Sequence, residues 1–153
     1  KYMPITLEGK LLSAHTTKYF YGLNFNQDNI KKSKKAILVE SEKAVMQLES
    51  ILNDNIALAL SSSSLSAIQV ELLIKLGVQE VIVALDKEYE EYGSKEEKLY
   101  AMKIRKGILN KLTTYFNVSV IWDKEGLIGY KESPSDRGSE VFWKLMNTRL
   151  RIN

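Results

Sequence analysis

Short runs of apolar residues recur along the chain, separated by longer stretches in which apolar residues return with a helical period. Each run is continuously apolar, as expected for a strand buried on both faces of a sheet, whereas a half-exposed strand alternates apolar and polar residues. Four such runs predict buried strands, at residues 36–39, 56–60, 81–85 and 118–122.

Helical patterns lie between and after these runs. The first carries apolar residues from Val45 to Leu52, and the second runs from Leu65 to Leu76 with a serine before it and Gly77 after it as end signals. The third runs from about Ser94 to Phe116, and a last helix follows Pro134. The predicted inner stripe of the third helix consists of Met102, Ile108, Leu109, Leu112 and Tyr115.

Strands that alternate with helices predict an α/β fold, in which right-handed crossovers build a parallel sheet with helices on both faces. The chain has 153 residues, which is enough for one domain with a proper core. Residues 1–35 show no comparable alternation. We therefore expect them to form a mixed N-terminal segment that packs beside the sheet.

The composition is that of an ordinary soluble globular protein, with 44% hydrophobic and 27% charged residues. No apolar run approaches the roughly 20 residues that span a bilayer, and no signal peptide opens the sequence, so we expect a cytoplasmic protein with no membrane partner. There is no cysteine and only one histidine, which excludes disulfides and zinc sites built from these residues. Any metal ion must therefore be held by oxygen.

Acidic residues stand where two of the predicted strands end. Glu40 follows the first run, while Asp86 and Glu88 follow the third, two positions apart, so that in extended chain they point the same way. Ligands of open α/β sheets bind beyond the carboxyl ends of the strands, so neighbouring first and third strands would bring the three carboxylates together. The alternative is that they are ordinary helix-start residues, because Asp and Glu favour a helix N-terminus.

Carboxylates gathered in this way repel one another unless a cation or protons intervene. Hard oxygen ligands without histidine or cysteine favour Mg²⁺ or Mn²⁺. Such ions typically assist attack at phosphorus, because they stabilise both the entering and the leaving oxygen. The three carboxylates therefore predict a metal-assisted reaction at a phosphate.

Two stretches, ILVE ending at Glu40 and VIVALDKE ending at Glu88, resemble the Toprim domain, the metal-binding catalytic module of bacterial-type primases, some topoisomerases and some nucleases. Its pattern is a glutamate after the first strand and Asp-x-Asp after the third; Glu88 stands in place of the second aspartate. The stretch KYFYGLNFNQ before Glu40 resembles the primase branch, including phage and plasmid members, in which Tyr-Gly-Leu precedes the glutamate strand. The Asp-Pro-Asp that often follows the fourth strand appears here as SPSD, which leaves Asp136 as its one carboxylate.

This resemblance implies a Toprim-type four-stranded, mainly parallel sheet in a catalytic domain over residues 36–153, with residues 1–35 coming from the primase N-terminal subdomain. It implies a nucleotidyltransferase that makes RNA primers on a single-stranded DNA template from ribonucleoside triphosphates during replication. Glu40, Asp86 and Glu88 are the expected catalytic and metal-ligating residues, with Mg²⁺ as cofactor and Mn²⁺ as a substitute. A replicative helicase is the expected partner of regions outside this sequence.

Two other functions remain open from the sequence. One is a Toprim nuclease that uses the same metal ions with water as the nucleophile, and the other is a non-catalytic Toprim-like module that binds nucleic acid. Because the first residue is Lys1 and not methionine, we expect the sequence to be a piece of a longer primase that primes weakly or not at all by itself.

Basic residues provide the candidate contacts with nucleic acid. The net charge of +3 is too small to indicate nucleic-acid binding by itself. We predict that a lysine cluster before the glutamate strand contacts phosphates, with a solvated loop as the alternative: Lys31, Lys32, Lys34 and Lys35. Lys1 and Lys18 match basic positions of primases and are further predicted contacts. Lys43 is expected to pair with Glu42 or to bind a nucleotide phosphate. Most lysines of the third helix, among them Lys103, are expected to face solvent.

Overall fold

A five-stranded sheet with the strand order β4-β3-β5-β6-β7 forms the centre of the protein in a computed structural model that describes residues 5–7, 10–12 and 18–153. Four of its strands are parallel, and the edge strand β7 runs antiparallel to β6. The strands are β3 (Lys35–Val39), β4 (Ala57–Ala59), β5 (Glu80–Val83), β6 (Asn117–Val120) and β7 (Leu150–Arg151). A separate antiparallel hairpin consists of β1 (Ile5–Leu7) and β2 (Lys10–Leu12).

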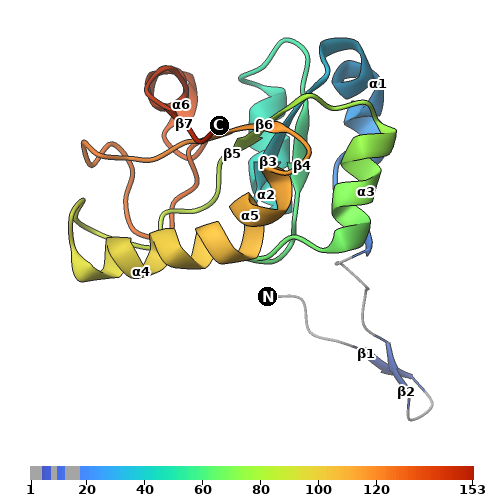
Figure 1. The fold of residues 1–153 in the computed structure, drawn as a ribbon, viewed down its shortest axis with the longest axis horizontal. Helices are drawn as coiled ribbons and strands as arrows, with labels where there is room; N and C mark the ends of the chain where they lie inside the picture. Colours follow the sequence, from blue (N-terminus) through green and yellow to red (C-terminus); the bar gives the residue numbers. More distant parts are fainter. Residues whose placement is uncertain (1–4, 8–9, 13–17) are drawn as a thin grey trace.

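Helices connect the parallel strands and surround the sheet (Figure 1). They are α1 (Leu23–Ser33), α2 (Glu42–Glu49), α3 (Ala67–Lys75), α4 (Lys95–Ile104), the π-helical segment η2 (Arg105–Leu109), α5 (Asn110–Leu112) and α6 (Gly138–Asn147). The segments α4, η2 and α5 follow one another without a break. Among the described residues, no helix is both long and apolar enough to cross a membrane.

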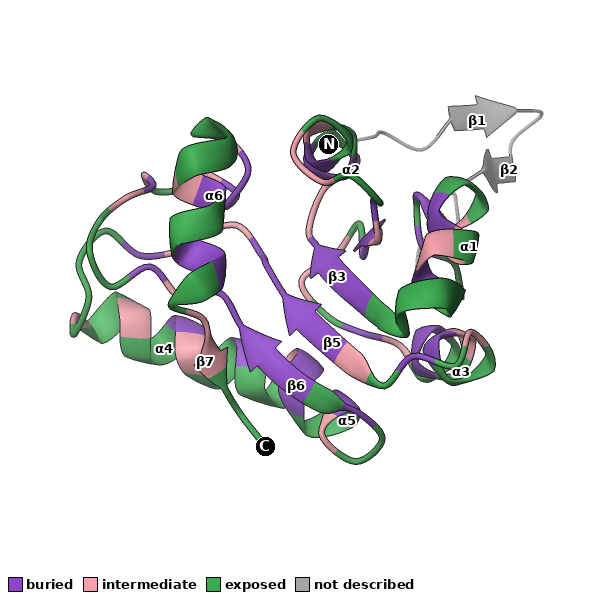
Figure 2. Ribbon diagram, turned by 90° about the horizontal axis from the view of Figure 1, so that it is seen from above, coloured by how far each residue is buried: buried purple, intermediate pink, exposed green. Residues whose placement is uncertain are grey.

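Two hydrophobic clusters cover the two faces of the sheet, whose four parallel strands are buried over most of their length (Figure 2). Neighbouring residues of β3 point to opposite faces: Leu38 belongs to the cluster under α1, α3 and α4, and Ile37 belongs to the cluster under α2 and α6. This double coverage explains why the strands read as continuous apolar runs. The predicted α/β fold with helices on both faces is confirmed, and the short edge strand β7 adds a fifth strand to it.

The inner stripe predicted for the third helix is wrong at two positions. Met102 and Tyr115 are 50% and 60% exposed, whereas the buried residues of this region are Tyr100, Ile104, Ile108, Leu109 and Leu112. The π-helical segment η2 has more residues per turn than an α-helix, so a stripe extrapolated with the α-helical period drifts off the buried face. The buried residues Tyr100, Ile104, Ile108 and Leu112 follow one another at a spacing of four residues, and their side chains face the sheet.

The Tyr-Gly-Leu sequence docks the start of α1 on the edge strand β4. Tyr21 bridges to Ala59 of β4, and Gly22 has a φ of 92°. A Cβ at Gly22 would lie 3.0 Å from the carbonyl oxygen of Ala57 and 3.0 Å from Cγ1 of Val45, so the close approach requires glycine. Asn26 strengthens this contact by donating a buried hydrogen bond of 2.8 Å to the Ala57 carbonyl. The assignment of residues 1–35 to a separate N-terminal segment remains a prediction.

Candidate active site

The predicted adjacency of the two strands that carry the acidic residues is correct. β3 and β5 are parallel neighbours with Leu38 opposite Val83, and the amide of Ala84 donates to the Leu38 carbonyl at 2.8 Å. Their carboxyl ends therefore reach the same edge of the sheet, where Glu40 follows β3 and Asp86 follows β5. This edge is the usual position of ligand sites in open α/β sheets.

Asp86 has an unfavourable environment for a carboxylate. Its Oδ1 atom is buried and has no hydrogen-bond partner, and it is the one such side-chain atom found among the described residues. Burial, followed by the negative charges of Glu40 and Asp136, raises the pKa of Asp86 to about 6. Its backbone carbonyl is held by the Tyr100 hydroxyl at 2.7 Å, which fixes the chain at this position. Asp86 thus presents an unsatisfied acceptor on a fixed backbone.

Glu40 lies beside Asp86 and is partly buried. Burial and then the charge of Glu88 raise its pKa, while Lys103 and Lys131 act in the opposite direction. The next residue, Ser41, caps α2 by accepting a hydrogen bond from the Ala44 amide at 3.3 Å. Ser41 therefore stabilises the start of α2 directly after the acidic residue.

Glu88 has a different environment, because each of its carboxylate oxygens has a lysine partner. Lys103 Nζ lies 2.7 Å from Oε2, and Lys131 Nζ lies 3.2 Å from Oε1. Burial raises the pKa of Glu88, but the hydrogen bonds from the two lysines outweigh it and the net shift is downward. Lys103 therefore does not simply face solvent, as the sequence suggested.

The three carboxyl groups share one edge of the sheet without forming a ready-made set of three ligands. In residues 18–153, no group of three or more Asp, Glu, His or Cys side chains is arranged to hold a metal ion. Glu40 raises the pKa of Asp86, and Glu88 raises that of Glu40, but only Glu88 has a lysine partner at each of its oxygens. The pair Glu40 and Asp86 is accordingly the part of the predicted site that is open to a cation.

Asp136 approaches Asp86 from the loop before α6. Its carboxylate binds Lys43 Nζ at 2.7 Å, Gln47 Nε2 at 2.9 Å and the Ser133 amide at 2.8 Å. These contacts tie the loop to α2, and the charge of Asp136 helps to raise the pKa of Asp86. The pairing of Lys43 with Asp136 was not foreseen, because the two residues are distant in sequence.

A buried ion pair holds the segment that carries Asp86 and Glu88. Lys87, which is 4% exposed, places its Nζ 2.8 Å from Asp123 Oδ2 and 3.0 Å from the Ile128 carbonyl. Asp123 also accepts the amides of Leu127 and Ile128, and its carbonyl accepts the Tyr89 hydroxyl at 2.8 Å. Sequence reasoning passed over Lys87, which stands between two acidic residues and gives no hint that its side chain points inward.

Comparison with known proteins extends these observations. No family model matches the chain. The SPbeta prophage-derived uncharacterized protein YorJ of Bacillus subtilis strain 168 is 38% identical over 160 residues, which cover 99% of this chain and 42% of YorJ. The crystal structure of the Aquifex aeolicus primase, with its zinc-binding and RNA polymerase domains, has a TM-score of 0.67 at 20% identity and matches 94% of this chain and 32% of its own.

A DnaG primase catalytic domain bound to single-stranded DNA has a TM-score of 0.62 at 21% identity and matches 90% of this chain and 41% of its own. The chain has the fold of a bacterial primase catalytic core. The resemblance to primases stated from the sequence is thereby confirmed for the fold. The chain spans about two fifths of YorJ and 32% and 41% of the two primase chains.

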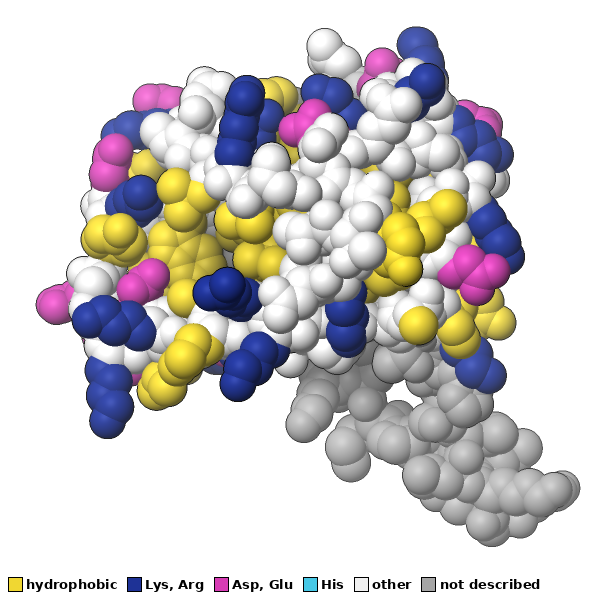
Figure 3. Space-filling view, viewed as in Figure 1, with side chains coloured by type: hydrophobic (Ala, Val, Ile, Leu, Met, Phe, Trp, Pro, Cys, Tyr) yellow, Lys and Arg dark blue, Asp and Glu magenta, His cyan; other side chains and the backbone are white. Residues whose placement is uncertain are grey.

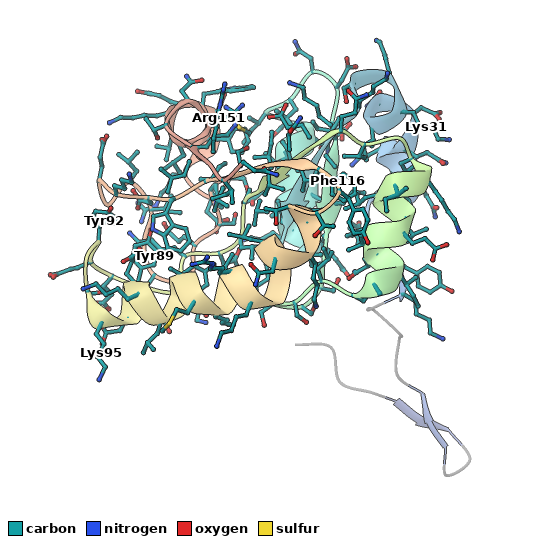
Figure 4. All side chains as sticks on the ribbon, viewed as in Figure 1. Lys31, Tyr89, Tyr92, Lys95, Phe116 and Arg151 are labelled. Carbon is teal, nitrogen blue, oxygen red and sulfur yellow. The ribbon has the colours of Figure 1, made fainter. Side chains whose placement is uncertain are left out.

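The predicted lysine cluster lies at the other end of this primase-core fold. Lys35 opens β3 and pairs with Glu80 at 2.9 Å, whereas Glu40 follows the last residue of β3. Five strand residues span about 16 Å, so the cluster lies at the opposite edge of the sheet from Asp86. Figure 4 shows Lys31 on α1, on the opposite side of the molecule from Tyr89. Lys18 is exposed, and Lys1 lies outside the described residues.

Proposed function

We propose that the chain forms the metal-dependent catalytic part of a primase-type nucleotidyltransferase, which makes short RNA on single-stranded DNA for replication. The observation that carries this proposal is the buried, unpartnered Oδ1 of Asp86 beside Glu40, at the carboxyl edge of a primase-core sheet. The likeness to a primase catalytic domain bound to single-stranded DNA supports nucleic acid as the substrate class.

Glu40 and Asp86 are the residues that we propose to hold Mg²⁺ or Mn²⁺. The donor atoms are all oxygen and Asp86 Oδ1 lacks a partner. Burial raises both pKa values, with a further contribution from the charge of Glu88 on Glu40 and from the charge of Glu40 on Asp86, so the two side chains fit a divalent cation. Mg²⁺ is commonly bound through one or two carboxylates, with water and substrate phosphates completing its coordination. When bound, it would activate the attacking hydroxyl and neutralise charge on the reacting phosphate.

Glu88 is not assigned as a metal ligand in this proposal, because both of its oxygens already have lysine partners. Lys43, from α2, also acts on Asp86, and its side chain is 63% exposed although it contacts Asp136. The hydrogen bond that Lys43 donates to Asp136 is the main cause that raises the pKa of Lys43, so the ammonium group stays charged at neutral pH. We propose that Lys43 contacts a nucleotide phosphate.

The proposal is tested by primer synthesis on a single-stranded DNA template with ribonucleoside triphosphates and Mg²⁺ or Mn²⁺. The weak template-dependent synthesis expected of the wild-type chain by itself should fall at least 100-fold in Asp86→Asn, which should remain folded, because the substitution removes a proposed ligand. Asp54→Asn is the control, since Asp54 is an exposed residue whose carboxylate lies 3.9 Å from Lys32 on α1.

A parallel reaction with Mn²⁺ and no nucleotides separates the alternatives. If DNA or RNA strands are shortened in a reaction that requires Asp86, the activity is hydrolysis and not nucleotidyl transfer. Nucleic-acid binding that needs neither metal ion nor Asp86, without any synthesis or cleavage, would contradict a catalytic role and favour a binding module.

A further inference from the structure

Two lysines from different elements converge on the carboxylate of Glu88. Lys103 comes from α4, and Lys131 comes from the loop between β6 and α6. Lys and Arg side chains are prominent along the edge where α4 runs (Figure 3). A single lysine is enough to neutralise one carboxylate, so the group of Glu88 and its two lysines keeps a net positive charge.

The exposure of these side chains differs in a way that suits anion binding. The Glu88 side chain is 21% exposed, whereas Lys103 and Lys131 are 44% and 57% exposed. Each ammonium group has three N–H donors and its hydrogen bond with Glu88 uses one of them, so donors remain for a ligand. Glu88 acts as the covered anchor, and the two ammonium groups are its accessible part.

The backbone fixes Lys131 in this position. Its φ is 66°, a left-handed conformation that is uncommon for a residue other than glycine and costs about 1 kcal/mol or more. Its amide donates to the carbonyl of Lys87 at 2.7 Å, and Lys87 is itself held by the buried pair with Asp123. The side chain of Lys131 therefore starts from a point set by the same structure that positions Asp86.

The two lysines lie within electrostatic reach of the proposed metal ligands. Lys103 and Lys131 both lower the pKa of Glu40, and Lys131 also lowers that of Asp86, in each case against the larger effect of burial. An anion held by the lysines would consequently lie next to the Glu40 and Asp86 pair. In the reaction proposed above, the anion that must be held beside the metal ion is the phosphate chain of the incoming nucleotide.

We infer that Lys103 and Lys131, positioned by Glu88, form a binding site for the phosphate chain of a nucleoside triphosphate beside Glu40 and Asp86. This inference rests on the proposed function, since it names the residues that would receive the substrate at the same edge of the sheet. Lysine binds phosphate as a point charge, so two lysines on one anchor suit a flexible chain of phosphates. The sequence predicted Glu88 as a third metal ligand, and the two lysines instead place positive charge at this position.

The test uses the double variant Lys103→Met with Lys131→Met, which keeps the length of both side chains and removes their charge. Calorimetry with tripolyphosphate, in the presence and absence of Mg²⁺, is expected to give at least a tenfold lower affinity than for the wild type. Lys98→Met, which changes an exposed lysine on the same helix, is expected to stay within twofold. Thermal melting establishes that both variants are folded.

Separate titrations distinguish this inference from the proposed function. If the double variant binds tripolyphosphate as tightly as the wild type, the inference is overturned whatever the result with metal ions. If affinity falls tenfold, the inference stands, and Mn²⁺ titration of the wild type then decides independently whether the metal site exists. A loss of affinity for a thymidine oligonucleotide with unchanged tripolyphosphate binding would assign the lysines to the template and overturn the inference.

Discussion

At the scale of single residues, the environment of Asp86 in the folded protein disfavours its ionised form. Its Oδ1 is buried without a donor, and burial with the charges of Glu40 and Asp136 raises its pKa to about 6. Leaving a buried acceptor unpaired costs about 1–3 kcal/mol. A divalent cation would supply both the missing partner and the opposite charge, so the unfavourable environment is explained by ligand binding and not by stability.

The first prediction concerns the pH dependence of this effect. The pKa of Asp86 in the folded protein, about 6, lies above its usual 3.8, so its contribution to stability is fully present below about pH 4 and is lost as pH rises through 6. Asp86→Asn, which has no charge to lose, should therefore exceed the wild type in unfolding free energy by about 1–3 kcal/mol at pH 7.5. Below pH 4 the difference should vanish.

Urea unfolding at both pH values in the presence of EDTA measures this difference. A variant that is less stable than the wild type at pH 7.5 would mean that the Asp86 carboxylate is stabilising, contrary to the environment described above.

The second prediction concerns the buried pair of Lys87 and Asp123. Lys87→Met leaves the Asp123 carboxylate buried without its cation, which should lower the unfolding free energy by about 3–5 kcal/mol. The neighbouring exposed Lys124→Met should change it by less than about 0.5 kcal/mol. Denaturant titration of both proteins gives the comparison, and equal stabilities would show that the pair is dispensable.

At the scale of elements, the sequence predicted what local patterns determine. The buried strands and the α2 and α3 helices were found because continuous apolar runs, a serine cap and a terminal glycine act within a few residues. The two-residue strand β7 is too short to give a pattern, and its pairing with β6 depends on the path of the chain after α6. The buried stripe of the third helix was misplaced because η2 changes the helical period.

The third prediction tests the docking of α1 on β4. Gly22→Ala forces a Cβ into contact with the Ala57 carbonyl at a left-handed φ, so a loss of unfolding free energy of about 2–4 kcal/mol is expected. Gly77 also has a positive φ, 73°, but a Cβ there meets nothing within 4 Å. Gly77→Ala should therefore cost only about 1 kcal/mol, the contribution of the backbone alone. Equal losses in the two variants would remove the steric explanation for the Tyr-Gly-Leu sequence.

At the scale of the whole molecule, the site depends on which strands are neighbours. Glu40 and Asp86 were predictable because the carboxyl ends of parallel strands meet at one edge once β3 and β5 are adjacent. The partners Lys103 and Lys131 were not predictable, because they reach this edge from elements whose position only tertiary packing decides, and Asp136 was indicated only by the resemblance of SPSD to a primase motif. The same geometry separates the lysine cluster at Lys31 from the acidic edge.

The fourth prediction follows from this separation. The double variant Lys31→Gln with Lys32→Gln should leave Mn²⁺ affinity within twofold of the wild type, because the distance to Asp86 exceeds the screening length of about 8–10 Å. Lys131→Gln removes a charge that acts on both Glu40 and Asp86 and should increase Mn²⁺ affinity at low salt. An equal response of both proteins in electron paramagnetic resonance titrations would contradict the separation of the two edges.

The central claim is that Glu40 and Asp86 together bind a divalent cation, and Mn²⁺ titration of the isotopically labelled chain tests it most directly. Paramagnetic broadening is expected first at the amides of Glu40, Ser41 and residues 86–88, with residues 31–35 spared, and Asp86→Asn should abolish it. Broadening centred elsewhere, or unchanged in the variant, would contradict the account.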